Sequence, residues 1–391
     1  MLESTIGDEN VKKLVVTIVA FALIIGQQPS VLAINDIDWY DFPISPVSEK
    51  WHELITFEDK MIATQIPDDI LANMSTPALL ETMINGWWGY GLFTAYDDLY
   101  TGLDVMEEYF NGFKEYYNRE DGYKIALDRY QKIDLTEIRT GHTWQREDNI
   151  NIWQLYLLEA MLCRYFDFER ITTEEAHDLI SLFEIKIKEK ESISSPELGN
   201  AILLMMLSGC PYYPNNHNHG HINTVGGWWA TWNQSRNDRV KTPNQTWITT
   251  TELSSRDYTY SERSDLDDYY LCSFYPATVI SSSTLKYNCH SHAFYSEYTS
   301  NQYWIDGSNI SPYWGDGSYS SMGSTYGAVM HSSHTSYSNV RVVWGYANPQ
   351  HSAIRDNSNG LRSKWGTGPT MVHTIGNSPY PTNTSIYWYY R

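Results

Sequence analysis

Apolar residues in the first half of the chain recur at three- and four-residue spacing, which is the pattern of amphipathic helices. Ser75, Thr76 and Pro77 form a start signal ahead of one such segment. The spacing continues in three later segments: Ile152 to Tyr165, Thr173 to Lys190 and Pro196 to Leu207. From typical helix and connection lengths we expect a bundle of roughly six to eight helices. This helical domain is assigned residues 34–209.

From about Cys210 the pattern becomes typical of short strands joined by turns. Charged residues become rare, while Asn, Ser, Thr, Gly, Tyr and Trp dominate. Residues 210–266 are predicted to be a loop-rich connector and residues 267–391 a second domain. Strand-like runs in this part are Phe274 to Ile280, Asn339 to Trp344, His351 to Arg355 and Leu361 to Trp365. The predicted class is α+β, with a helical bundle followed by a domain in which a helix packs on a small antiparallel sheet.

The N-terminus has the features of an export signal. Lys12 and Lys13 precede an apolar run from Leu14 to Gly26, and Ala33 ends a stretch suited to cleavage. The run is shorter than the roughly 20 residues that a membrane span needs. We expect residues 1–33 to be a signal peptide and the mature protein to be secreted or cell-wall associated, without membrane insertion. Three acidic residues among the first ten leave an uncleaved anchor as the alternative.

Charge is distributed unevenly along the 391 residues. Residues 211–391 hold 11 basic and 11 acidic residues, so the whole net charge of −20 lies in residues 1–210. An acidic half without a basic patch argues against nucleic acid and anionic membranes as partners. Solubility is the simpler explanation of this acidity. Four cysteines are too few for a disulfide framework in an exported chain of this size.

Candidate chemistry centres on Cys289. The residues before it are extended in character, and Asn288 is a favourable N-cap, so Cys289 is predicted in the first turn of a helix. A helix N-terminus lowers the pKa of a thiol, and its unpaired backbone N–H groups can receive an oxyanion. The competing interpretation is that Cys289 is a buried small hydrophobe, as free cysteines commonly are.

A thiolate nucleophile needs a base that the fold, rather than the neighbouring sequence, positions. His351 is the predicted base, because a turn delivers it to the start of a strand 62 residues after Cys289. His290 and His292 are too close to Cys289 along the chain. We expect these two residues to pack or to bind substrate, with His292 as the substrate-binding candidate. The competing interpretation of His351 is an ordinary strand residue.

The residue that orients the imidazole is left open between two candidates. In the run from Leu361 to Trp365, period-two alternation puts Ser363 on the buried face and Lys364 on the opposite face, unless a bulge intervenes. His373 would approach from a following strand. Ser363 is a weak orienting group and is only slightly preferred to His373.

Four sequence blocks resemble those of a group of uncharacterised exported proteins of Gram-positive bacteria: NCHSHAFY (288–295), HSAI (351–354), SKWG (363–366) and SPY (378–380). The first block of that group usually reads NCHSYAWY, so His292 and Phe294 depart from it. Residues 66–83 are also similar to the N-terminal region of the group. More remotely, the order of Cys and His resembles the papain-like superfamily of NlpC-type and CHAP-type peptidases and amidases. That resemblance implies a papain-like fold and amide hydrolysis, often of peptidoglycan peptides.

Two further patterns are candidates for binding. His217, His219 and His221 alternate and could hold a metal ion if they lay on a strand, but a flexible loop is the preferred interpretation and no cofactor is expected. Trp304 and Trp314 belong to a near repeat ten residues apart. They would stack on sugars or line a groove beside Cys289, although packing at two Asp-Gly turns is the preferred interpretation.

These observations support two main functional hypotheses. The first is hydrolysis of amide bonds in a peptide or peptidoglycan substrate, through a thioester on Cys289 with His351 carrying the proton. The second is a non-catalytic secreted protein that binds glycans or surfaces on a papain-like scaffold, which the Tyr, Trp, Asn and Ser content of residues 211–345 fits equally well. An amide-forming transferase or a toxin with the same Cys and His is a third possibility.

Overall fold

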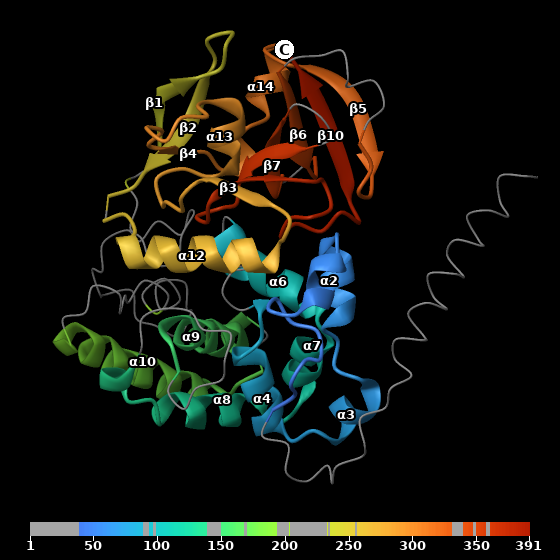
Figure 1. Ribbon diagram of the computed structural model, residues 1–391. Helices are drawn as coiled ribbons and strands as arrows, with labels where there is room; N and C mark the ends of the chain where they lie inside the picture. Colours follow the sequence, from blue (N-terminus) through green and yellow to red (C-terminus); the bar gives the residue numbers. More distant parts are fainter. Residues whose placement is uncertain are drawn as a thin grey trace, which may run out of the picture.

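The computed structural model describes residues 39–88, 94–96, 99–138, 150–167, 170–193, 203, 233, 235–254, 256–330, 339–346, 349–356 and 360–391. A helical region over residues 49–193 precedes antiparallel sheets with interspersed helices (Figure 1), which confirms the predicted α+β class. The predicted signal peptide lies outside the described residues, as does nearly all of the helix predicted over residues 196–207. Within the described ranges, no helix combines the length and the apolar character needed to span a bilayer.

The described part of the helical region contains eight α-helices and two short 3-10 helices: η2 (Glu49–Glu53), α2 (Phe57–Ala63), α3 (Asp68–Asn73), α4 (Thr76–Ile84), α6 (Leu99–Tyr109), α7 (Asn111–Asn118), α8 (Gly122–Gln131), η3 (Leu135–Glu137), α9 (Ile152–Asp167) and α10 (Thr173–Ile193). The predicted start of α4 is confirmed, because the Ser75 side chain accepts the backbone N–H of Ala78 at 3.3 Å. α9 and α10 cover the two predicted segments that begin at residues 152 and 173.

Two antiparallel sheets follow the helices. One has the order β1-β2-β4, and the other has the order β3-β9-β8-β7-β6-β10-β5. Their strands are β1 (Arg236–Lys241), β2 (Trp247–Glu252), β3 (Thr278–Ser281), β4 (Tyr303–Trp304), β5 (Ser320–Tyr326), β6 (Val340–Trp344), β7 (His351–Arg355), β8 (Leu361–Lys364), β9 (Thr370–His373) and β10 (Ser385–Tyr390). The helical elements among them are α12 (Tyr260–Ser273), α13 (Cys289–Phe294), η4 (Gly307–Asn309) and α14 (Pro312–Gly315). β6, β7 and β8 occupy three of the predicted runs.

Two local predictions were wrong. The region expected to be a loop-rich connector contains β1, β2 and the first turns of α12. The run expected to be a strand from Phe274 begins with the turn that follows α12, and β3 begins only at Thr278. α12 begins with a capping box, in which Thr259 and Glu262 each accept the other's backbone N–H. This start signal at Thr259 explains why a helix forms where a loop was expected.

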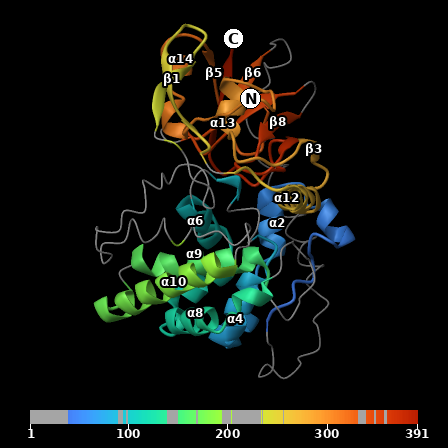
Figure 2. The ribbon, with the colours of Figure 1, turned by 90° about the vertical axis from the view of Figure 1, so that its left-hand side faces the viewer.

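The helical region and the sheets share one aromatic core. Trp51 of η2 packs edge-on against Trp87 with ring centroids 4.6 Å apart, and Trp87 contacts Phe274 at 6.2 Å. Phe274 in turn packs against Trp365, immediately after β8, at 5.1 Å. The indole N–H of Trp51 also donates to the Ser273 carbonyl at 2.9 Å. α12, which ends at Ser273, lies along the boundary between the helices and the seven-stranded sheet (Figures 1 and 2).

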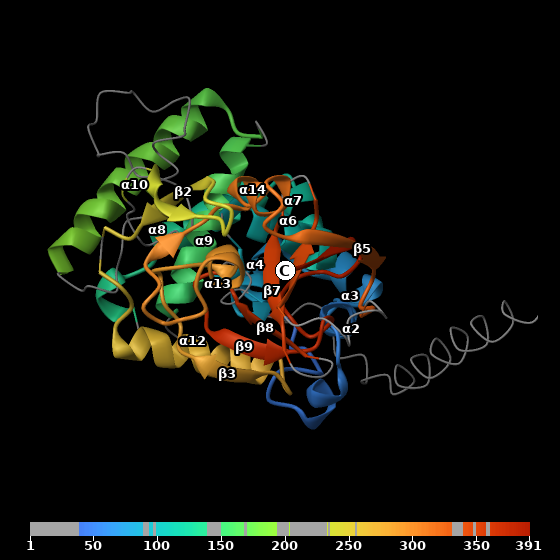
Figure 3. The ribbon, with the colours of Figure 1, turned by 90° about the horizontal axis from the view of Figure 1, so that it is seen from above.

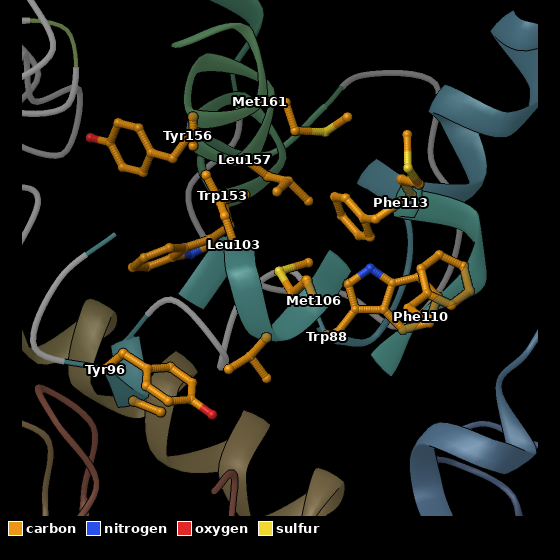
Figure 4. Close-up of a cluster of buried hydrophobic side chains, with 14 of the residues drawn as sticks. Trp88, Tyr96, Leu103, Met106, Phe110, Phe113, Trp153, Tyr156, Leu157 and Met161 are labelled. Atoms are coloured by element: carbon orange, nitrogen blue, oxygen red, sulfur yellow. The ribbon is translucent and has the colours of Figure 1, made fainter. Parts of the chain in front are cut away.

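Aromatic and methionine side chains continue this core into the helical region (Figure 4). The rings of Trp88 and Phe110 lie 4.0 Å apart, and both side chains are completely buried. Leu157 and Met161 of α9 approach the same cluster from another side. The core of the helical region is therefore continuous with the aromatic contacts that reach the sheet.

Replacing Trp51 with Ala should lower the free energy of unfolding by about 3–5 kcal/mol, because it removes a fully buried indole from the shared core. The loss of helix is followed by circular dichroism and the loss of sheet packing by tryptophan fluorescence. Both transitions should move to the same lower urea concentration in the variant. Ile55→Ala is the control; its side chain is 62 % exposed, and its removal should change the free energy by less than about 0.5 kcal/mol. Two separate transitions in the Trp51 variant would contradict a shared core.

Candidate active site

Cys289 is the first residue of α13, as predicted, and its side chain is 1 % exposed. Asn288 caps the helix: its Oδ1 atom accepts the Ser291 backbone N–H at 3.1 Å. The Nδ2 group of Asn288 donates to the Ile305 carbonyl at 2.7 Å, so the cap is also attached to the residue after β4. One amide side chain therefore starts the helix and fixes it against a neighbouring segment.

α13 packs against β7 and β8, beside which it lies in Figure 3. His351 is the first residue of β7 and is completely buried. Next to it, Ser352 is hydrogen-bonded through Oγ to His290 Nδ1 on α13 at 2.7 Å. The fold therefore carries Cys289 and His351 on two elements that are packed together and joined by a hydrogen bond.

Aromatic rings hold the imidazole of His351. The Tyr380 ring stacks on it with centroids 3.6 Å apart and an interplanar angle of 14°, and Trp344 packs edge-on at 4.9 Å. Among the described residues, neither ring nitrogen of His351 has a hydrogen-bond partner. Buried polar atoms are usually paired in proteins, so two unpaired nitrogens on one buried ring call for a specific explanation.

Tyr380 connects this site to the helical region. Its hydroxyl donates to the Ala95 carbonyl at 2.6 Å, and the Tyr96 hydroxyl donates to the Pro379 carbonyl at 2.9 Å. The rings of Tyr96 and Tyr380 also pack edge-on at 5.5 Å. The ring that covers His351 is therefore held in place by backbone and side chains of residues 95 and 96.

The two candidates for orienting His351 are hydrogen-bonded to each other. His373 Nδ1 lies 2.7 Å from the Thr374 carbonyl, which can only accept, so Nδ1 carries the proton. The Ser363 hydroxyl therefore donates to His373 Nε2 at 2.7 Å, and it accepts the indole N–H of Trp365 at 3.0 Å. Ser363 is buried as predicted, but in this structure neither it nor His373 is hydrogen-bonded to His351.

Lys364 is completely buried, so the face of β8 opposite Ser363 is covered as well. β8 ends at this residue, and its Nζ atom donates to three carbonyls: those of Thr284 at 3.1 Å, Gly366 at 2.7 Å and Gly368. An ammonium group has three N–H donors, so these carbonyls satisfy it and make its burial tolerable. The local sequence does not signal this burial, because one of the three carbonyls belongs to Thr284, which is 80 residues away in the chain.

Four buried histidines lie around the site, and all are neutral at pH 7. Burial lowers the pKa of His351 well below the ordinary 6.5, and His373, His290 and His292 act in the same direction. Burial likewise lowers the pKa to about 3 for His290 and His292 and to about 4 for His373. A neutral imidazole can accept a proton, which is the state that a general base requires.

The three predicted substrate-binding residues are largely covered. Trp304 is completely buried in β4, and the partly exposed Trp314 stacks on Tyr389 at 4.6 Å with an interplanar angle of 15°. His292 is buried and its ring is roughly parallel to that of Tyr287 at 6.3 Å. Neither ring nitrogen of His292 has a hydrogen-bond partner in the described part of the chain. A ligand would contact Trp304 or His292 only after neighbouring groups moved.

The described residues contain no group of three or more His, Cys, Asp or Glu side chains arranged to hold a metal ion. His217, His219 and His221 lie outside them, so that weak candidate stays a prediction. No family model, curated protein or solved structure matches the chain. The chemistry of the site is therefore argued from its own residues.

The buried histidines make stability sensitive to acid. An unfolded chain binds protons on histidine near pH 6.5, whereas the folded protein binds them only near pH 3–4, so stability falls as the pH drops below 6.5. Each such histidine should contribute about 1.4 kcal/mol per pH unit in that window. Urea unfolding at pH 7, 6 and 5 measures how steeply the free energy of unfolding changes with pH. The His292→Gln variant should show a slope that is smaller by the contribution of one histidine, about 1.4 kcal/mol per pH unit. A flat profile from pH 6.5 to 5 would contradict the neutral, buried assignment.

Proposed function

We propose that this protein is an exported cysteine hydrolase that cleaves amide bonds, with peptides such as those of peptidoglycan as the substrate class. Residues 267–391 would form a papain-like catalytic domain of the NlpC or CHAP type. The observation that carries the proposal is the environment of His351. It is a buried, neutral imidazole with two unpaired nitrogens, and it lies on the strand against which the Cys289 helix packs.

In the proposed reaction, the sulfur of Cys289 attacks the carbonyl carbon of the amide. His351 takes the thiol proton and passes it to the nitrogen of the leaving amine, whose bond to carbon breaks to give a thioester. Water then attacks the thioester with His351 as base, the acid product leaves, and the thiol is restored. A general base works best when its pKa lies near the working pH, so the low pKa of His351 belongs to the closed state without substrate.

Closure of the site is also the observation that favours the second candidate, a non-catalytic protein that binds glycans or surfaces. Cys289 is 1 % exposed and His351 is covered by Tyr380, so substrate reaches either residue only after Tyr380 or its neighbours move. Catalytic hydrogen bonds often tighten only in the complex with substrate, which is why the hydrolase remains the preferred function. A binding protein needs no such movement at Cys289.

The hydrolase proposal predicts that purified peptidoglycan or its peptides release new amino groups when incubated with the mature protein. Cys289→Ala should abolish this release, with a loss of at least about a thousandfold, and His351→Ala should reduce it by about a hundredfold or more. The matched control is Cys272→Ala, which removes a cysteine on α12 that has no part in the proposed reaction. Amino groups are counted by fluorescence and the products are identified by mass spectrometry.

Equal release by wild type and Cys289→Ala would contradict the hydrolase. If wild type releases nothing yet sediments with cell walls, and Cys289→Ala sediments equally well, the binding function replaces it.

A further inference from the structure

A buried cation lies beside the segment that leads from β3 into Cys289. Lys364 donates to the Thr284 carbonyl in that segment and to the Gly366 and Gly368 carbonyls in the turn after β8. In the same place, the Thr284 backbone N–H donates to the Thr367 carbonyl at 3.2 Å. The lysine and this backbone bond join the turn after β8 to the segment that carries Cys289.

Two carboxylates hold the same segment. Asp267, on α12, accepts the backbone N–H and the hydroxyl of Ser283 at 2.9 and 2.6 Å. Asp257, which precedes α12, accepts the Thr284 hydroxyl at 2.8 Å and the Leu285 backbone N–H at 2.9 Å. The chain directly before the candidate nucleophile is thus fixed by charged groups that belong to different elements.

The ammonium group of Lys364 also lies beside a residue that is close to Cys289 in the chain. Its Nζ atom lies 5.5 Å from the ring centroid of Tyr287, two residues before the cysteine. Burial lowers the pKa of Lys364 to about 7, while the negative charges of Asp257, Asp267 and Cys289 act in the opposite direction. In a dry interior, an ammonium group and a nearby thiolate each favour the charged form of the other.

We propose that Lys364 is a positioning residue for Cys289, whose ammonium group fixes the segment before the nucleophile and stabilises its thiolate. The proposal rests on the proposed function only in treating Cys289 as the nucleophile. It gives Lys364, in the SKWG block, a role distinct from that of Ser363. The hydroxyl of Ser363 is already hydrogen-bonded to His373 and Trp365.

The test measures the pKa of Cys289 in the full chain. The ¹³Cβ resonance of labelled cysteine is recorded as a function of pH. This measurement needs no reagent to enter the closed site, and Cys289→Ser identifies the resonance. Lys364→Met should raise the pKa of Cys289 by about one unit or more, which is a roughly tenfold smaller thiolate fraction near neutral pH. An unchanged pKa in the folded variant would overturn the proposal.

Lys60→Met is the matched control. Lys60 is also buried, donates to the Leu54 carbonyl and to Asn377 at 3.2 Å, and lies 5.7 Å from the ring centroid of Trp51. Its loss removes a buried ammonium group of the same kind without a contact to the segment before Cys289. The pKa of Cys289 should stay at its wild-type value, and an equal rise in both variants would overturn the specific role of Lys364.

A reciprocal measurement covers the case in which Lys364→Met does not fold. Coupling between two titrating groups is mutual, so Cys289→Ala should lower the pKa of Lys364, read from its ¹³Cε resonance, by the same amount. An unchanged lysine pKa would overturn the proposal. Failure of the two proposals is distinguishable: coupling without amide cleavage rejects the hydrolase alone, and cleavage without coupling rejects the role of Lys364 alone.

Discussion

Burial of aromatic side chains from both halves of the chain against one another is the interaction on which the rest of the structure depends. Trp365 is the last ring in the series that begins at Trp51, and it directly follows the buried end of β8. Its indole N–H holds Ser363, and the preceding Lys364 holds the segment before Cys289. The position of the candidate site therefore depends on packing contacts that begin in the helical region.

Features set by nearby residues were predictable, whereas features set by distant residues were not. The start of α4, the position of Cys289 at the start of α13 and the bounds of β7 all follow from local signals. β1 was missed because nearly all of its side chains are exposed, which leaves no alternation to detect. The burial of Lys364 depends on carbonyls up to 80 residues away, which no local pattern reveals.

The imidazole of His351, the candidate base, is oriented by other groups than the sequence predicted. A hydrogen bond to one nitrogen would fix the tautomer of His351 and leave the other nitrogen for chemistry. The stacked ring of Tyr380 and the edge of Trp344 instead fix the plane of the imidazole and leave both nitrogens open. Ser363 and His373, the predicted orienting residues, are hydrogen-bonded to each other instead.

The enclosure of Cys289 also bears on how long its thiol survives. Cysteine oxidation to sulfenic acid and beyond follows thiolate character and access, and a thiolate stabilised by Lys364 would be the more reactive form. With 1 % of its surface exposed, Cys289 is kept from peroxide and from other thiols while the site is closed. Outside the cell, where the mature protein is proposed to act, the same packing that restricts substrate would preserve the sulfur in its reduced form.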